Sequence, residues 1–152
     1  MGTVTYSNEK VAKFISLNYV PVKIETSNGA LMEKFAVSWT PTIIVLDADG
    51  REHYRGVGFF APEDMIATFM AAKGRWALDL GMLPEARAMF EEVLSYYPGG
   101  EPAAMATFFL GVARYKTDHD PKVLREAYDA LKEKFPQSVW TKQADHYRLI
   151  NK

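Results

Sequence analysis

The sequence predicts an α/β domain over residues 1–72, followed by an all-helical extension over residues 73–152. Residues 1–72 combine β-branched, strand-like segments with segments whose apolar residues recur at helical spacing. From Lys73 onward, almost every apolar pattern has the helical period. No linker rich in glycine and serine separates the two parts, so we expect one continuous helix to join them.

The first part begins with a predicted helix, a strand and a second helix. Asn8–Leu17 carries its apolar residues on one helical face. Tyr19–Ile24 is rich in β-branched residues and predicts a strand, which Pro21 restricts to a sheet edge or to a strand start. Asn28–Phe35 is predicted to form a short helix.

A hairpin and a third helix are predicted next. Thr42–Leu46 is β-branched and apolar, as in a strand buried on both faces. A turn ending at Gly50 leads into Arg51–Val57, the predicted returning strand. Pro62, followed by two acidic residues, is typical of a helix start. We therefore expect a parallel strand pair bridged by a helix, then the hairpin, then a helix.

Composition excludes several classes of function. The chain has 152 residues, no cysteine and a formal net charge of −1. Without cysteine it can form no redox CxxC centre, thiolate metal site or cysteine nucleophile. Its charge balance lacks the basic excess typical of nucleic-acid or membrane binding, so we expect neither partner. No apolar run is long enough to span a bilayer, and no signal peptide is apparent, which favours a soluble, cytoplasmic protein.

The remaining polar residues indicate no cofactor, no metal and no catalytic group. His53, His119 and His146 fall on a predicted strand, a loop and a helix, without the spacing of a zinc site. Gly56 and Gly58 lack the third glycine and the following helix of a phosphate-binding loop. We therefore expect no cofactor, and we do not expect the chain as printed to be catalytically active.

A series of motifs between Trp39 and Gly58 carries a family resemblance. Together with Asn18–Lys23, the series resembles the second half of thioredoxin-like proteins over roughly residues 4–72. The motifs, in order, are Trp39-Thr40-Pro41-Thr42, Ile43–Asp47, Asp49-Gly50 and Tyr54–Gly58. The resemblance implies a cis peptide bond before Pro41. It also implies that four residues face a substrate or a protein partner: Trp39, Thr40, Pro41 and Gly58.

The sequence also departs from this family. Family members begin with a buried strand that delivers CxxC at a helix N-terminus, where the helix dipole lowers the thiol pKa. By resemblance, the strand absent here would lie between Tyr19–Ile24 and Thr42–Leu46, leaving two unpaired edges. The two strands could pair directly, a second copy could cover the edges in a homodimer, or Met1 could be an internal methionine of a longer product.

The helical part resembles a tetratricopeptide repeat. Gly81–Pro98 contains a small residue at a tight turn, then an alanine and a phenylalanine four residues apart, then a helix-breaking proline. Gly74 lies where the repeat needs a small residue. A second, degenerate unit would end at Pro136, and Ser138–Ile150 would form a capping helix. So short an array provides either a partner-binding groove or a structural extension that buries apolar surface.

Two functions remain open. The first is a protein-binding or adaptor module, a thioredoxin-like fold without redox cysteines that holds a protein or peptide partner. The alternative is an N-terminally truncated thiol–disulfide oxidoreductase whose CxxC lies upstream of Met1. In that alternative, the resemblance implies that Thr40 and Pro41 bind the substrate backbone and that Trp39 shapes the site.

Overall fold

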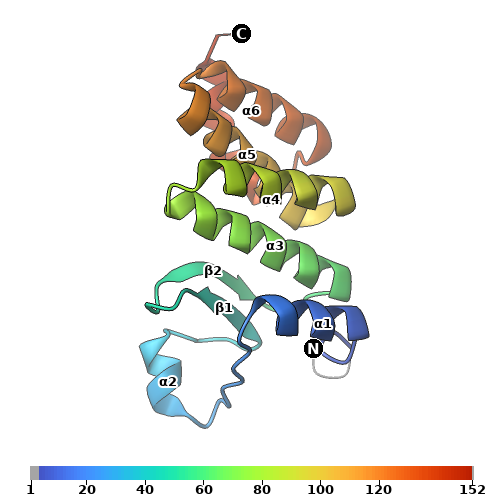
Figure 1. Cartoon of the computed structure of the whole chain (residues 1–152), viewed down its shortest axis with the longest axis vertical. Helices are drawn as coiled ribbons and strands as arrows, with labels where there is room; N and C mark the ends of the chain where they lie inside the picture. Colours follow the sequence, from blue (N-terminus) through green and yellow to red (C-terminus); the bar gives the residue numbers. More distant parts are fainter. Residues whose placement is uncertain (1–3, 152) are drawn as a thin grey trace. The chain divides into compact units, whose positions relative to one another are not determined.

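The computed structural model describes residues 4–151. Contacts divide the chain into two compact units, residues 1–66 and residues 67–152. Helix α3 (Pro62–Asp79) runs through this boundary, so the expectation of one continuous helix is confirmed (Figure 1). The predicted fold class is also confirmed, because a mixed α/β part is followed by a helical part. The predicted domain boundary at residue 72 falls inside α3.

Two predicted helices of the N-terminal unit are confirmed, and asparagine side chains cap both. Helix α1 spans Glu9–Asn18, and the side-chain oxygen of Asn8 accepts hydrogen bonds from the first backbone amides of the helix. Helix α2 spans Gly29–Lys34 and is capped by Asn28 in the same way. Each cap satisfies amides that have no partner inside the helix, which fixes where the helix begins.

The predicted hairpin is confirmed. Strand β1 (Thr42–Leu46) pairs antiparallel with β2 (Glu52–Val57), and Thr42 lies opposite Val57. The register shifts between Val45 and Leu46, where β2 has one additional residue. The expectation that β1 is buried on both faces is wrong. Its residues are half-buried and Leu46 is exposed, because the sheet formed by the described residues has two strands only.

The predicted strand at Tyr19–Ile24 is not formed among the described residues, so the parallel strand pair is wrong. The backbone is extended at Tyr19, but residues 19–25 have no regular secondary structure. The side chains of Val20 and Val22 are 90% and 77% exposed. A β-branched segment becomes a strand only beside a partner, and no described strand lies hydrogen-bonded to this one. Direct pairing with β1 is therefore not observed.

The N-terminal unit has a small core, and a close approach of the chain fixes its hairpin. Thr5 and Val11 are fully buried, and the Thr5 hydroxyl donates to the carbonyl of Phe60 at 2.6 Å. A Cβ atom on Gly56 would lie 2.4 Å from the Phe60 ring. Glycine at this position of β2 therefore lets the segment before α3 pack directly on the strand.

The C-terminal unit consists of antiparallel helices that meet at small residues. After α3 come α4 (Leu83–Tyr96), α5 (Gly100–Asp118) and α6 (Lys122–Lys134). A Cβ atom on Gly74 of α3 would lie 2.7 Å from the ring of Phe90 on α4, and one on Gly111 of α5 would lie 2.5 Å from the Cβ of Ala127 on α6. None of the helices in residues 4–151 has the length and apolar character needed to cross a membrane.

The expected capping helix over Ser138–Ile150 is only partly correct. Helix α7 covers Val139–Gln143, and the chain then tightens into a 3-10 helix, η1 (Asp145–Leu149). Contacts within the unit hold this end of the chain: the Arg125 guanidinium donates to the carbonyls of Arg148 and Ile150. These long-range hydrogen bonds compete with the formation of a regular helix. The spacing of apolar residues alone could not predict this competition.

Candidate functional site

The structure brings two of the residues implied by the resemblance into direct contact. The backbone N–H of Gly58 donates to the carbonyl of Pro41 at 2.8 Å, which extends the β1–β2 ladder by one pair. The peptide bond between Thr40 and Pro41 is cis, the conformation that the resemblance implies. The Thr42 hydroxyl donates to the carbonyl of Trp39 at 2.6 Å and ties the turn to the first residue of β1. The turn therefore lies at one end of the hairpin.

Gly58 serves this site through its backbone. Its φ is +103°, in a region that L-residues rarely adopt, and a Cβ atom there would meet nothing within 4 Å. The glycine is therefore required because of its backbone conformation, and not because a larger side chain would clash with its neighbours. The conformation turns the chain out of β2 directly after Val57 and leaves the ring of Phe59 exposed.

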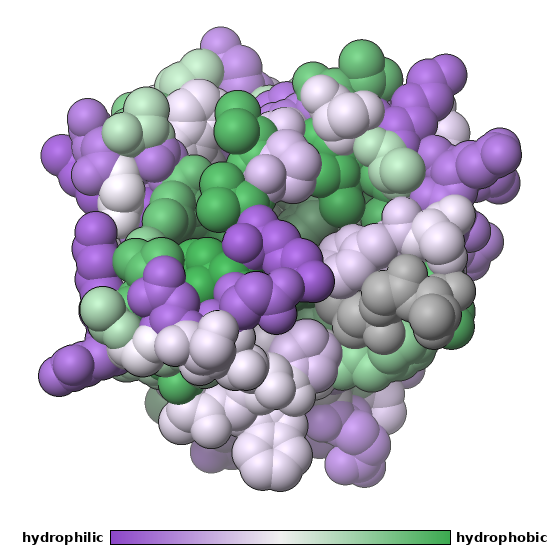
Figure 2. All heavy atoms as spheres, turned by 90° about the horizontal axis from the view of Figure 1, so that it is seen from below, coloured by the Kyte–Doolittle hydropathy of each residue, from purple (hydrophilic) through white to green (hydrophobic). Residues whose placement is uncertain are grey.

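The surface beside the turn is open and contains a hollow of about 310 Å³. The Trp39 side chain, which is 69% exposed, forms part of its wall. Figure 2 shows apolar side chains that remain exposed between polar ones on the face it presents. The hollow is lined by Thr26, Met32, Ser38, Trp39 and Thr40.

Sequence reasoning did not assign three of the residues in this hollow to the site: Thr26, Met32 and Ser38. Met32 comes from α2, and Thr26 comes from the loop that precedes it. Neither belongs to the Trp39 motif or to a motif of its own. The available signal was the short predicted helix at residues 28–35, which places an apolar side chain near the following turn.

An arginine on β2 connects the hairpin to the end of α2. The guanidinium of Arg55 donates to both carboxylate oxygens of Glu52, at 2.6 and 2.8 Å, and to the carbonyl of Phe35 at 2.8 Å. Arg55 holds the pKa of the Glu52 carboxyl below its usual range. This network fixes the segment before Trp39 to the sheet, because Phe35 is the residue at the C-terminal cap of α2.

A second polar cluster organises the opposite end of the hairpin. One carboxylate oxygen of Asp47 accepts hydrogen bonds from the amides of Asp49 and Arg51, each at 2.9 Å. The other oxygen lies 2.9 Å from Nε2 of His53, and both side chains are largely shielded from solvent. The hydrogen bond with His53, followed by that from the amide of Arg51, lowers the pKa of Asp47.

This cluster predicts an acid-sensitive hairpin. Because the folded pKa of Asp47 lies below its unfolded value of about 3.9, its carboxylate stabilises the fold above that pH. The stabilisation is lost as the pH falls through the folded pKa. The difference in unfolding free energy between wild type and Asp47→Asn, from urea titrations, should be fully developed above about pH 5 and shrink progressively as the pH is lowered from there. A difference that stays constant over this range would contradict the prediction.

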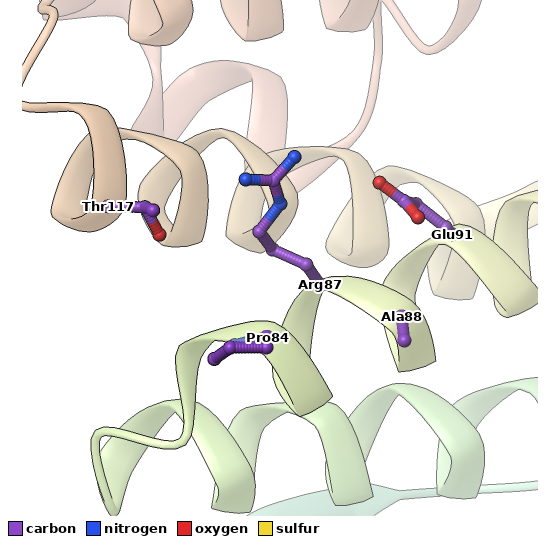
Figure 3. Close-up of a pocket in the computed structure, with 5 residues that line it drawn as sticks. All are labelled: Pro84, Arg87, Ala88, Glu91 and Thr117. Carbon is purple, nitrogen blue, oxygen red and sulfur yellow. The ribbon is translucent and has the colours of Figure 1, made fainter.

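A further shallow hollow lies in the C-terminal unit, between α4 and α5 (Figure 3). Its volume is about 250 Å³. Figure 3 shows the Arg87 side chain extending from α4 toward α5, with Glu91 on the same helix and Thr117 on α5. One cation and one carboxylate on an open surface suit a polar contact with another molecule but supply no catalytic arrangement.

The histidines do not converge on a common site. Within the part of the chain that the structure describes, no group of three or more histidine and carboxylate side chains is placed to hold a metal ion. His53 is paired with Asp47 on the hairpin, His119 ends α5 in a left-handed conformation, and His146 lies in η1. The three histidines therefore lie in separate parts of the described chain.

Residues 3–73 match the family model of a thioredoxin-like domain. The chain contains a thioredoxin-like domain. Comparisons with curated proteins and with solved structures gave no match. The thioredoxin-like domain carries no redox CxxC here, because the chain has no cysteine. Its match ends inside α3, so helices α4 to α6 lie outside it and their resemblance to tetratricopeptide repeats stays a prediction.

Proposed function

We propose that the thioredoxin-like domain binds an extended segment of a partner protein on the surface formed by Trp39, Thr40, Pro41 and Gly58. The observation that carries this proposal is the exposed indole of Trp39 beside a preformed hollow. Large exposed aromatic side chains next to a pocket are typical of interaction sites. Because the chain has no cysteine, the bound segment is held and not oxidised or reduced.

The chemistry of the hollow indicates which segment it takes. Its walls carry no charged side chain and combine two threonines, a serine, a methionine and an indole. Such a surface contacts apolar and neutral polar side chains, and the flexible thioether of Met32 adapts to different shapes. We therefore propose an uncharged or weakly charged polypeptide segment as the partner.

Selection from a phage library of random peptides tests this function. Selected peptides are synthesised and titrated against the protein, with the indole N–H signal of Trp39 followed by NMR. We expect this signal to shift and Trp39→Ala to weaken binding by about tenfold or more, as for a central aromatic at an interface. Tyr96→Ala is the matched control, since Tyr96 is equally exposed but lies on α4.

Two results would contradict the proposal. The first is a selection that yields no peptide above background. The second is a set of peptides that binds Trp39→Ala as tightly as wild type, since binding would then occur elsewhere. Circular dichroism of both variants shows whether each keeps the wild-type fold.

We also propose, as a second candidate, an oxidoreductase whose CxxC lies upstream of Met1. Its support is the sheet of the described residues, in which one edge of β1 is unpaired while residues 20–24 are exposed and have no regular secondary structure. Insulin reduction by the printed chain is compared with that by a form extended upstream in the genomic reading frame. Reduction by the extended form alone supports this candidate, and inactivity of both forms rejects it.

A further inference from the structure

A side chain of the hairpin caps the C-terminal end of α2. The last carbonyls of a helix have no partner inside it, and the negative end of the helix dipole favours a cation there. The carbonyl of Phe35, at the C-cap of α2, accepts a hydrogen bond at 2.8 Å from the guanidinium of Arg55 on β2. Two hydrogen bonds from the same guanidinium to Glu52 fix the direction in which it donates. Arg55 is therefore a helix cap supplied by another element.

The turn beyond this cap carries one wall of the hollow. The backbone of Ala36 is left-handed, with a φ of +48°, and its N–H donates to the carbonyl of Glu33. The N–H of Val37 donates to the carbonyl of Met32 at 2.8 Å. This pair of hydrogen bonds is the Schellman pattern of helix ends. It ties the backbone of Met32, whose side chain lines the hollow, to the residues that lead into Ser38 on the same hollow.

Few other contacts hold this segment to the hairpin. Helix α2 has no fully buried residue. Within the described part of the chain, all other hydrogen bonds of residues 29–37 stay inside residues 25–37. The preceding residues 20–25 are exposed and have no regular secondary structure, so they do not fix the position of the helix. The hydrogen bond from Arg55 is therefore the polar contact that sets where α2 lies against β2.

We propose that Arg55 is a positioning residue for the peptide surface: by capping α2, it holds Met32 and the Trp39 turn in the arrangement that forms the hollow. The inference rests on the proposed function, because the arrangement matters for binding only if a peptide occupies the hollow. Arg55 is not among the residues that line the hollow, so it acts through the wall and not by touching the peptide. A preformed site binds more tightly than one that must be ordered during binding. Removing the cap should therefore weaken binding without removing a contact with the peptide.

Substitution of Arg55 tests this role. Arg55→Met keeps an unbranched side chain but removes its charge and its hydrogen-bond donors. We expect the selected peptides to bind this variant about fivefold to tenfold more weakly, measured by fluorescence anisotropy of labelled peptides. Arg55→Lys keeps one cationic donor for the Phe35 carbonyl and should restore part of the affinity. Arg51→Met is the matched control, because Arg51 is exposed and bonds to the Asp47 turn through its backbone, and it should change the affinity by less than about twofold.

A double-mutant cycle separates positioning from a general loss of stability. If Arg55 acts through the wall, Arg55→Met should have little further effect on peptide affinity once Met32→Ala has removed that wall. A substitution that merely destabilised the hairpin would lower the affinity by the same factor in both backgrounds. Equal factors would therefore overturn the proposal.

NMR of the free protein tests the positioning without a peptide. In Arg55→Met, the methyl signal of Met32 and the indole N–H signal of Trp39 should shift, while the amides of β1 and β2 keep their protection from hydrogen exchange. Signals that stay at their wild-type positions overturn the proposal, and so does an unchanged peptide affinity of this variant. A selection that yields no peptide contradicts the proposed function instead, and the signals of the free variant still decide whether Arg55 positions the wall.

Discussion

Replacing Phe90 with alanine is expected to lower the free energy of unfolding of the C-terminal unit by about 3–5 kcal/mol. The Phe90 side chain is fully buried and stacks on Phe109 with 6.0 Å between ring centroids. Its ring also fills the space beside Gly74, where the backbone of α3 approaches α4. Removing the ring leaves a cavity that rigid neighbouring helices cannot close. Urea unfolding followed by circular dichroism measures the loss.

Tyr96→Ala provides the control for this substitution. Tyr96 lies on the same helix as Phe90 but is 71% exposed, so its truncation should change the unfolding free energy by no more than about 0.5 kcal/mol. If Phe90→Ala were as mild as Tyr96→Ala, the packing of α4 against α3 described above would be wrong.

Gly111→Ala should destabilise the protein by about 1–3 kcal/mol, although alanine is the better helix former. The new Cβ would lie 2.5 Å from the Cβ of Ala127, and neither atom can rotate away. The two helices α5 and α6 must then move apart and lose contacts along their length. Thermal or urea unfolding of the variant measures the effect.

The second variant of this experiment adds Ala127→Gly, which removes the opposing atom. If the clash is the cause, the double variant should be more stable than the sum of the two single changes predicts, and the double-mutant cycle should give a clear coupling energy. Additive effects would show that Gly111 matters for another reason, such as the conformation of its own helix.

Local signals allowed much of the fold to be predicted. Asn8 and Pro62 mark helix starts, and the turn at residues 47–50 joins two strands, so each element is specified by residues close in sequence. The prediction of a strand at Tyr19–Ile24 was wrong because a strand also needs a neighbouring strand, which the described residues do not supply. The prediction of one helix at the end of the chain was only partly correct, because hydrogen bonds from Arg125, which is distant in sequence, hold the segment after α7.

Only part of the candidate site could be predicted from the sequence. Motif order placed Pro41 and Gly58 on one surface, and the structure joins them by a hydrogen bond. The wall contributed by Thr26 and Met32 depends on how the loop after α1 returns to the hairpin. No local pattern encodes that path, because it is determined by long-range contacts such as the hydrogen bond from Arg55 to Phe35.

The exposed stretch between α1 and α2 is a place where the chain can accept inserted residues. Helix α1 is held by the buried side chain of Val11, and α2 begins at its own cap, Asn28. Residues 20–25 between them are exposed and carry no regular structure. Doubling the length of such a connection costs only about 0.6 kcal/mol. Insertions, and even a whole inserted domain, can therefore be accommodated there while both helices keep their positions.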